Sequence, residues 1–472
     1  MNTLTQMIRI LPDRSARWYR LKTALAYLGI FIISAGDTVR YGLGWTVWGV
    51  LCFGLAGACL VLFLRSEPIH TIRRVPYTLW VFLGLLVLSL AWSYYPINTL
   101  MGLAGSAISF IFALFLVSLF SWRDMLRILS NVFRFILASS ILFELYAALI
   151  VHGPIAPIFK NYEGTVPPSG AYYWTQGNLL DGVRIQGIVG NANLLAYVAM
   201  LGFLLFAIQY AIRATSRWVA VCSMALAALC LALTRSAGIG FAMMGVALAA
   251  VVALIAEGHD RETRHRYYRL AWTGFGVLAF FVLVYREQAF TLIGKSPDMT
   301  GRTEIWKAVM GLIGQRPWQG WGWISYWMPG VAPYEGLIVR DNVTYYQAHN
   351  SYLDVWLQVG IFGLLIFLAV LVITFIKLWR LAVRHTSPLY LWPLFIYVAL
   401  LLQNITESRM IVELGFVLVL VFAIKVNEPA EMLEPRGKSP KRLRLRLLGP
   451  ILNQLSVPAP ATTEPNDDAA KE

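Results

Sequence analysis

Long apolar runs separated by short polar turns dominate the pattern of this chain. The runs are about 17–25 residues long, the length that a helix needs to cross the hydrocarbon core of a membrane. The alternation over about ten residues per strand that marks a transmembrane β-barrel is absent. The pattern predicts an all-α, polytopic integral membrane protein with about twelve transmembrane helices. We expect them near residues 21–36, 43–64, 76–93, 99–120, 129–152, 187–211, 217–234, 237–256, 270–285, 351–376, 388–405 and 410–426.

Basic residues are concentrated in every second loop between these runs. One set of loops carries clusters such as Arg73–Arg74, Arg213 with Arg217, and Lys377 with Arg380. The short loops between them hold few Lys or Arg residues. Because cytoplasmic loops of membrane proteins are rich in Lys and Arg, the pattern predicts that the basic loops and both termini are cytoplasmic.

The same threading divides the chain into a membrane domain and a tail. Residues 1–426 form the predicted transmembrane domain, with long periplasmic loops at 152–186 and 286–350. Residues 427–472 form a basic and then disordered cytoplasmic tail. In the second loop, Thr300–Gly314 is expected to form a short amphipathic helix that lies along the membrane surface as a partial lid. Its apolar face would consist of Ile305, Trp306, Val309, Met310, Leu312 and Ile313.

Composition supports the same class of protein. The chain is 58% hydrophobic and only 14% charged, and a soluble protein could not cover so much apolar surface with so few charges. The net charge of +14 lies mainly in inter-helix loops and in the segment Arg436–Arg446, where it sets topology and meets anionic membrane lipids. Nucleic-acid binding is therefore not expected. The four cysteines lie within apolar runs and predict neither a disulfide framework nor a metal site.

Four cationic side chains fall on the side opposite to the basic loops. Arg184 and Arg235 stand at the ends of apolar runs, Arg302 opens the amphipathic helix, and His349 ends the long loop. A charge at membrane depth costs at least a few kcal/mol unless it finds a partner, and arginine forks bind phosphate oxygens bidentately. The grouping suggests a site for an anionic lipid headgroup. Snorkelling or solvated arginines and a structural histidine remain open alternatives.

Polar side chains beside these cations are candidates for substrate binding. Gln186 follows Arg184, Asn191 and Asn193 stand in the first turn of a helix, and Asn350 follows His349. Asparagines at such positions cap helices or bond phosphate and sugar oxygens, and the sequence leaves both open. The outer acidic residues form no Asp-x-Asp pair, and a lone histidine is a weak zinc signal. No metal and no cofactor are therefore expected.

Two sequence strings resemble those of a known family. His349–Asn350, nine residues, and then Gly360–Ile361–Phe362–Gly363 resemble the H-[NSQ]-x9-G-x-x-G signature of bacterial O-antigen ligases. Gly301–Trp306, followed by Pro317–Gly322, is similar to the G-R-x-x-x-W…P-x-x-G-x-G segment of the same superfamily. The surroundings of Arg184 and Arg235 resemble its other two arginine regions, although Arg235 stands in Thr-Arg-Ser rather than the more usual Ser-Arg-Gly. The resemblance covers roughly residues 180–370.

This resemblance implies a GT-C-like, multispanning inner-membrane glycosyltransferase. Such an enzyme moves an O-antigen glycan from undecaprenyl diphosphate to a sugar hydroxyl of lipid A–core at the periplasmic face, without a metal. Arg184, Arg235 and Arg302 would hold the diphosphate, and His349 would be the base for the acceptor hydroxyl in an inverting transfer.

Three alternatives to the ligase remain. An O-antigen polymerase or a protein O-oligosaccharyltransferase would use the same donor and a different acceptor. A lipid-linked glycan transporter belongs to another class, and it is less favoured because transporters usually place their ionisable site near the middle of the membrane.

Overall fold

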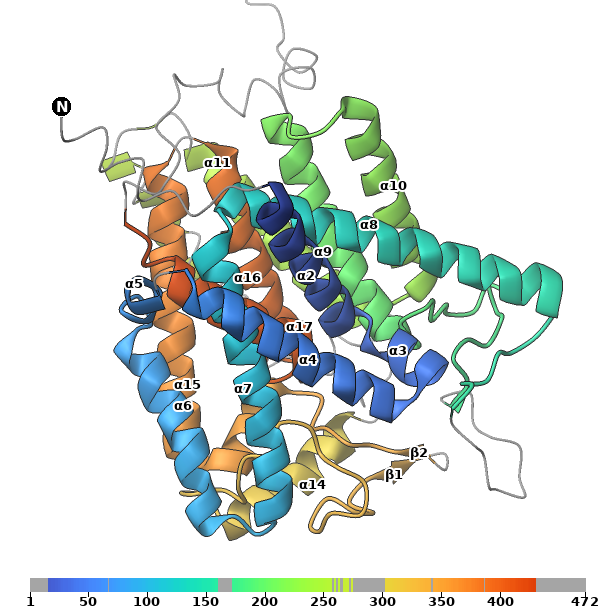
Figure 1. Ribbon diagram of the computed structural model, residues 1–472, viewed down its shortest axis with the longest axis vertical. Helices are drawn as coiled ribbons and strands as arrows, with labels where there is room; N and C mark the ends of the chain where they lie inside the picture. Colours follow the sequence, from blue (N-terminus) through green and yellow to red (C-terminus); the bar gives the residue numbers. More distant parts are fainter. Residues whose placement is uncertain are drawn as a thin grey trace, which may run out of the picture.

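The computed structural model describes residues 16–66, 68–159, 172–256, 259, 262–263, 266–270, 273–274, 302–340, 343–385 and 387–429 (Figure 1). The expected span at 270–285 lies almost wholly outside these residues, as do the first part of the long loop, residues 286–301, and nearly all of the predicted tail.

Helices make up most of the described chain. Its strands are the two short ones of an antiparallel hairpin, Val339–Arg340 (β1) and Val343–Thr344 (β2), each two residues long. The longer helices are separated by short 3-10 or π turns at Ser89–Trp92, Ala147–Val151 and Pro388–Tyr390. The α-helices are α2 (Ala16–Ser34), α3 (Gly36–Leu43), α4 (Trp45–Leu64), α5 (Pro68–Ile72), α6 (Tyr77–Leu88), α7 (Pro96–Leu119), α8 (Trp122–Tyr146), α9 (Ala192–Ile212), α10 (Arg217–Thr234), α11 (Ala237–Ala256), α14 (Arg302–Gln315), α15 (Ser351–Arg384), α16 (Leu391–Gln403) and α17 (Glu413–Lys425).

Six helices in the described part of the chain are long and apolar enough to cross a membrane, and α2 with α3, bent by 81°, makes a seventh if the pair is one span. The six are α4, α7, α8 with the π turn that follows it, α9, α10 and α15. The expected spans near 76–93, 237–256 and 388–405 coincide with shorter apolar helices. The prediction of a helical, multi-pass membrane protein is therefore confirmed. The number twelve and the GT-C-like arrangement stay predictions.

Helix α9 lies at the centre of the bundle. Of the residues in its most apolar stretch, 72% are buried, against 17% for α4 and 28% for α10. It packs against α8, α10 and α16. The outer helices expose large apolar side chains, such as Val50 and Phe53 on α4 and Trp218 on α10. An apolar outer surface is what a lipid environment requires, so α9 belongs to the core, together with α16 and α17, and α4 and α10 belong to the apolar outer wall.

A second apolar core is built on α14 and the loop that follows it, beside the lower ends of α6 and α7 in Figure 1. The predicted helix is confirmed to within two residues at its start. Its apolar face is confirmed except at Met310, which is 44% exposed. This face packs on the same chain, because the buried cluster contains Ile305, Val309, Leu312, Ile313, Trp321, Trp327, Tyr334 and Leu357. A position along the membrane surface stays a prediction.

Helix α15 is interrupted at Gly360, where φ is 70° and ψ is −177°. The segment Pro317–Gly322 docks into this interruption. Its last residue donates a backbone hydrogen bond to the Gln358 carbonyl (2.8 Å), and its first accepts one from the Ile361 N–H (3.0 Å). The two strings that carry the family resemblance therefore bind each other through their backbones. One begins next to Arg302 and the other begins at His349, so this contact also ties together two residues of the candidate site.

Replacing Gly360 by alanine is expected to destabilise the protein by about 2–6 kcal/mol, because two costs add up. The backbone conformation is one that almost only glycine adopts, and the added Cβ overpacks the site. An added Cβ would lie 1.9 Å from the Trp318 carbonyl oxygen. Thermal unfolding in detergent measures the effect. Gly84→Ala on α6 is the matched control, since a Cβ there meets nothing within 4 Å and alanine favours a helix. Equal unfolding temperatures for the two variants would contradict the prediction.

Candidate functional site

Four of the predicted site residues are linked through the carboxylate of Glu407, in the loop between α16 and α17. Its Oε1 accepts hydrogen bonds from the Arg302 guanidinium (2.9 Å) and the Asn193 amide (2.9 Å), and its Oε2 lies 3.2 Å from His349 Nδ1. Arg184 donates to the Asn193 side-chain oxygen. Glu407 is 5% exposed. Side chains from four separate segments of the chain thus form one continuous polar network.

The loop that carries Arg184 is fastened to α8 through Glu144. This fully buried carboxylate accepts hydrogen bonds from the backbone N–H groups of Gln186 (2.9 Å) and Gly187 (2.7 Å) and from the Thr175 hydroxyl (2.8 Å). A buried carboxylate is expensive unless its oxygens are satisfied, and here they organise a loop. The consequence is a fixed position for Arg184, whose Nε also donates to the Thr234 carbonyl (2.7 Å).

The loop that carries Glu407 is held against the start of α15. The Asn404 side-chain oxygen accepts from the Met410 N–H (2.8 Å) and the Ser351 hydroxyl (2.7 Å). The Ser351 N–H in turn donates to the Glu407 carbonyl (3.1 Å). Since His349 stands two residues before Ser351, these bonds bring its ring and the Glu407 carboxylate together.

His349 has the geometry of a base oriented by a carboxylate. A carboxylate can only accept, so the short contact with Glu407 assigns the imidazole proton to Nδ1. Nε2 then carries the free lone pair, and it has no hydrogen-bond partner among the described residues. The ring is also held by an edge contact with Tyr345, 5.7 Å between centroids. The backbone at His349 is left-handed (φ 49°), which sets the direction of the side chain.

The electrostatics of the site hold Glu407 ionised. Burial alone would raise the pKa of this carboxyl, but His349 and then the arginines Arg302 and Arg409 outweigh it and lower the pKa from 4.5 to about 2. The carboxylate is therefore a fixed negative charge at any physiological pH, and it can stabilise a proton on His349 without taking it.

Acid is expected to destabilise the protein through Glu407. A depressed pKa contributes stability above the ordinary value and loses it as the pH falls through the folded-state value, so the loss falls between about pH 5 and pH 2. The full contribution is about 3 kcal/mol. Thermal unfolding of wild type and Glu407→Gln across this range measures it. The wild type should lose its advantage over the variant with falling pH, and parallel curves would contradict the assignment.

Arg235 lies beside the network without being bonded into it. It ends α10 in a left-handed conformation (φ 47°), is exposed, and makes no hydrogen bond or ion pair with another described residue. Its neighbours are engaged: Thr234 accepts from Arg184, and the Ser236 hydroxyl donates to Asn193 (3.3 Å). A Cβ built on Gly182 would be 3.8 Å from the guanidinium, which places that side chain over the loop of Arg184.

The remaining predicted residues have structural roles in this network or next to it. Asn191 caps α9 by accepting from two backbone N–H groups (2.8 and 3.2 Å), and Asn350 caps α15 in the same way (3.0 and 3.1 Å). The capping alternative is thus observed for both, and substrate contact stays a prediction. Gln186 leaves its side-chain carbonyl oxygen buried without a hydrogen-bond partner among the described residues.

Two arginines of the site form no ion pair with a described carboxylate. A neighbouring cluster is neutral, because Arg40 pairs with Asp37 (2.7 Å) and Glu413 (3.0 Å), and Arg409 lies 4.0 Å from Glu413. Around Glu407, by contrast, Arg302 pairs with the carboxylate, whereas Arg184 and Arg235 form no ion pair with a described carboxylate. Guanidinium groups in this state are suited to binding an anion such as a phosphate.

Among the described residues, no group of three or more His, Cys, Asp or Glu side chains is placed to hold a metal ion. The expectation that neither a metal nor a cofactor takes part stays a prediction.

The fold and this site define a multi-pass helical membrane protein with a cation-rich polar centre outside its membrane helices. Residues 188–368 match the family model described as O-antigen ligase, which confirms the resemblance over this segment. The match contains Arg235, Arg302 and His349, whereas Arg184 and Glu407 lie outside it.

The chain is also similar to a curated protein, the exopolysaccharide production protein ExoQ of Rhizobium meliloti (strain 1021). The two are 26% identical over 221 residues. The aligned region covers 44% of this chain, which spans about half (49%) of the length of that relative.

Glu407 is the residue that the sequence analysis missed. It is one of the outer acidic residues, which form no Asp-x-Asp pair and to which the sequence pattern assigns no role. The available signal was its position next to Arg409, in a short polar turn between two apolar runs, where an ionisable residue marks a functional site by default.

Proposed function

We propose that this chain is a membrane glycosyltransferase that moves an O-antigen glycan from undecaprenyl diphosphate to a sugar hydroxyl of lipid A–core. The observation that supports the proposal best is the pairing of His349 with Glu407 near Arg184 and Arg235, which form no ion pair with a described carboxylate. The O-antigen ligase match over residues 188–368 supports the same reaction class. The donor, the acceptor and the metal-independent, inverting course are part of the proposal.

The leaving group would be held by the arginines. The acceptor oxygen forms a bond to the anomeric carbon while the bond from that carbon to the diphosphate oxygen breaks, and both electrons leave with the undecaprenyl diphosphate. Arg235 and Arg184 would face this growing negative charge, and neither forms an ion pair with a described carboxylate. Groups placed where charge develops stabilise the transition state most. Arg302 would contribute less, because Glu407 already binds it.

The proton would go to His349. Nε2 accepts the proton of the acceptor hydroxyl as the new bond forms, and the imidazolium is then stabilised by Glu407 at Nδ1. Attack from the face opposite the diphosphate inverts the anomeric centre. Glu407 orients the ring and stays ionised throughout, which agrees with its lowered pKa.

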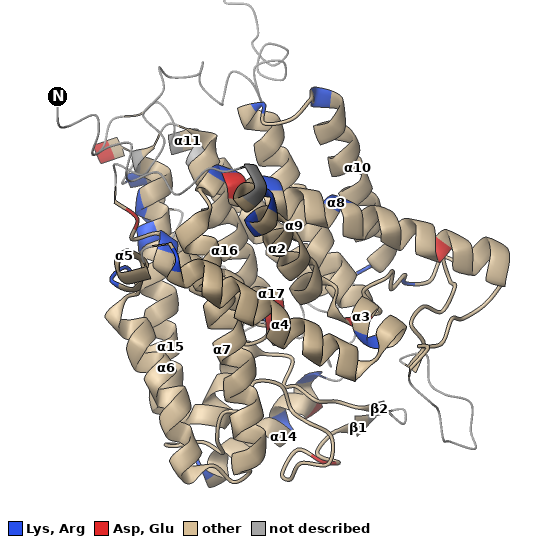
Figure 2. Ribbon diagram, in the orientation of Figure 1, with Lys and Arg blue, Asp and Glu red and all other residues tan. Residues whose placement is uncertain are grey.

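The proposed location is the bacterial inner membrane, with both termini cytoplasmic and the site periplasmic. Lys and Arg gather around α5, the first turns of α2 and the loop between α9 and α10, at the end of the bundle away from α14 (Figure 2). This distribution supports the orientation, because basic residues are retained on the cytoplasmic side.

A polysaccharide polymerase is the second candidate. The name of the relative from Rhizobium meliloti speaks of exopolysaccharide production, and a polymerase would use the same donor chemistry with a lipid-linked glycan as acceptor. A protein O-oligosaccharyltransferase and a lipid-linked glycan transporter are the further alternatives.

The deciding experiment supplies the purified protein in detergent with an undecaprenyl-diphosphate-linked glycan and, in separate reactions, lipid A–core, further donor, or an acceptor protein. Polysaccharide on lipid A–core supports the ligase, and longer lipid-linked chains support the polymerase. Glycosylated protein would support the oligosaccharyltransferase. Absence of every product, together with glycan movement across a vesicle membrane, would support a transporter and overturn the proposal.

A further inference from the structure

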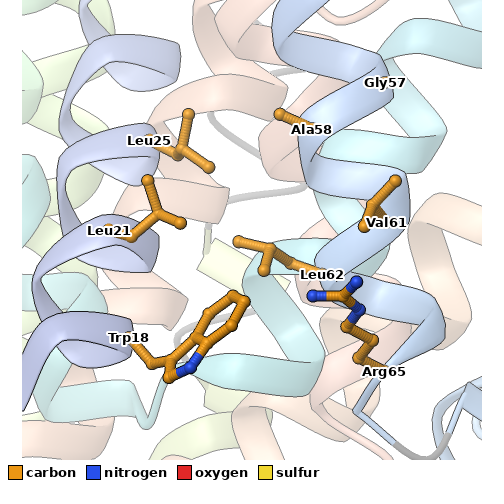
Figure 3. A pocket seen from close by; sticks show the side chains of 8 residues that line it. All are labelled: Trp18, Leu21, Leu25, Gly57, Ala58, Val61, Leu62 and Arg65. Carbon is orange, nitrogen blue, oxygen red and sulfur yellow. The ribbon is translucent and has the colours of Figure 1, made fainter. Parts of the chain in front are cut away.

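An apolar groove runs between α2 and α4, away from the site around Glu407. It has a volume of about 330 Å³. Leu21 and Leu25 of α2 form one wall, and Ala58 and Val61 of α4 form much of the other (Figure 3). Trp18 and Arg65 stand together at one end of the groove in Figure 3.

The groove exists because the two helices diverge toward this end. Further along, they are closely packed: a Cβ on Gly29 of α2 would come within 3.2 Å of Leu55 of α4 and within 2.3 Å of Phe112. At Gly57, by contrast, an added Cβ would meet nothing within 4 Å. The small side chains of Gly57 and Ala58 therefore leave a space that no described residue fills.

The end of the groove is built for a negative charge at a membrane surface. The Arg65 guanidinium lies 5.5 Å from the centre of the Trp18 ring, is exposed, and forms no ion pair with a described carboxylate. Arg20 and Lys22 add positive charge on the same part of α2. Tryptophan beside arginine is typical of the level of lipid headgroups. An apolar channel that ends in such a pair matches a chain with an anionic head.

We propose that this groove binds an anionic phospholipid, with one acyl chain between α2 and α4 and its phosphate at Arg65. Each part of the lipid has a counterpart: the leucines and Val61 face the chain, Trp18 lies at the interface, and Arg65 meets the phosphate. The undecaprenyl tail of the proposed donor fits less well, because its charged diphosphate belongs at the arginines around Glu407 and would leave Arg65 without an anion. The lipid site does not depend on the proposed function.

The test uses the full-length protein in vesicles of phosphatidylcholine with or without phosphatidylglycerol, followed by native mass spectrometry of the lipid that stays bound. Arg65→Gln keeps the groove and removes the charge. It should lower the preference for phosphatidylglycerol roughly fivefold, the effect expected for one cation at a membrane surface. An unchanged preference would overturn the headgroup assignment.

Gly57→Leu places a side chain in the groove from a position where the added Cβ meets nothing within 4 Å. Gly54→Leu is the matched control, because its Cβ also meets nothing within 4 Å and it does not line the groove. Loss of the retained phosphatidylglycerol in Gly57→Leu but not in Gly54→Leu supports the proposal. Equal retention in both variants, or retention of a polyprenyl lipid in this groove instead, would overturn it. Glycan transfer is measured separately, so failure of this proposal leaves the proposed function untouched.

Discussion

Replacing His349 by alanine is expected to lower the rate of glycan transfer by about 10²–10⁴-fold, the range that a positioned general base contributes. The variant removes the Nε2 acceptor while Glu407 keeps its hydrogen bonds from Arg302 and Asn193. Binding of the donor should therefore persist, and the loss should appear in the rate of the chemical step. The measurement is transfer from undecaprenyl-diphosphate-linked glycan to lipid A–core by purified protein.

His152→Ala is the matched control for this change. His152 also falls in a predicted periplasmic loop, is exposed, and has the same left-handed backbone (φ 56°), but it is bonded to no residue of the network around Glu407. Its replacement should leave transfer unchanged. Normal transfer by the His349 variant would show that the base assignment is wrong, whatever the product of the reaction.

The cations of the site could be predicted from the sequence because topology constrains them. Each of Arg184, Arg235, Arg302 and His349 lies outside the basic loops, and a charge near membrane depth requires a partner. That argument needs only the order of apolar runs and charges. It does not need to know which helices are neighbours, and three of the four side chains are indeed joined through Asn193 and Glu407.

The centre of the network could not be predicted in the same way. Glu407 is 214 positions from Asn193 and 105 from Arg302 along the chain, so the contacts depend on how α9, α14 and the α16–α17 loop pack. Asn191 and Asn193 look equivalent in the sequence, yet the first caps α9 and the second links Arg184 to Glu407. The path of the backbone into α9 decides that the Asn191 side chain caps the helix and that the Asn193 side chain reaches Glu407.

The interruption of α15 also escapes a reading based on hydropathy. The run from residue 351 is mostly apolar and predicts one uninterrupted span, but Gly360 breaks it to admit the segment Pro317–Gly322. Hydropathy reports how apolar a segment is and not the path of its backbone. A span that is broken to accept backbone hydrogen bonds therefore has the same hydropathy profile as a straight helix. The glycine spacing of the family string was the available signal.

Replacing Arg235 by alanine is expected to slow transfer by about 10²–10³-fold, the usual effect of removing one group that stabilises developing charge. Stability should be nearly unchanged, because the side chain is exposed and makes no ion pair with another described residue. Arg235→Lys should recover only part of the rate, since an ammonium keeps the charge and loses the bidentate fork. Transfer rates and thermal unfolding in detergent measure both effects.

Two further arginines separate a role in transfer from a role in folding. Arg213→Ala is the matched control, because Arg213 ends α9 in the same left-handed conformation (φ 54°) but lies in a basic loop, so neither rate nor stability should change. Arg302→Ala should lower the unfolding temperature as well as the rate. It leaves the buried Glu407 carboxylate without its closest guanidinium, and breaking a buried pair costs about 3–5 kcal/mol. If Arg235→Ala also unfolded early, Arg235 would be a structural residue and not one that binds the leaving group. If Arg302→Ala kept the unfolding temperature of the wild type, the pair with Glu407 would not stabilise the fold.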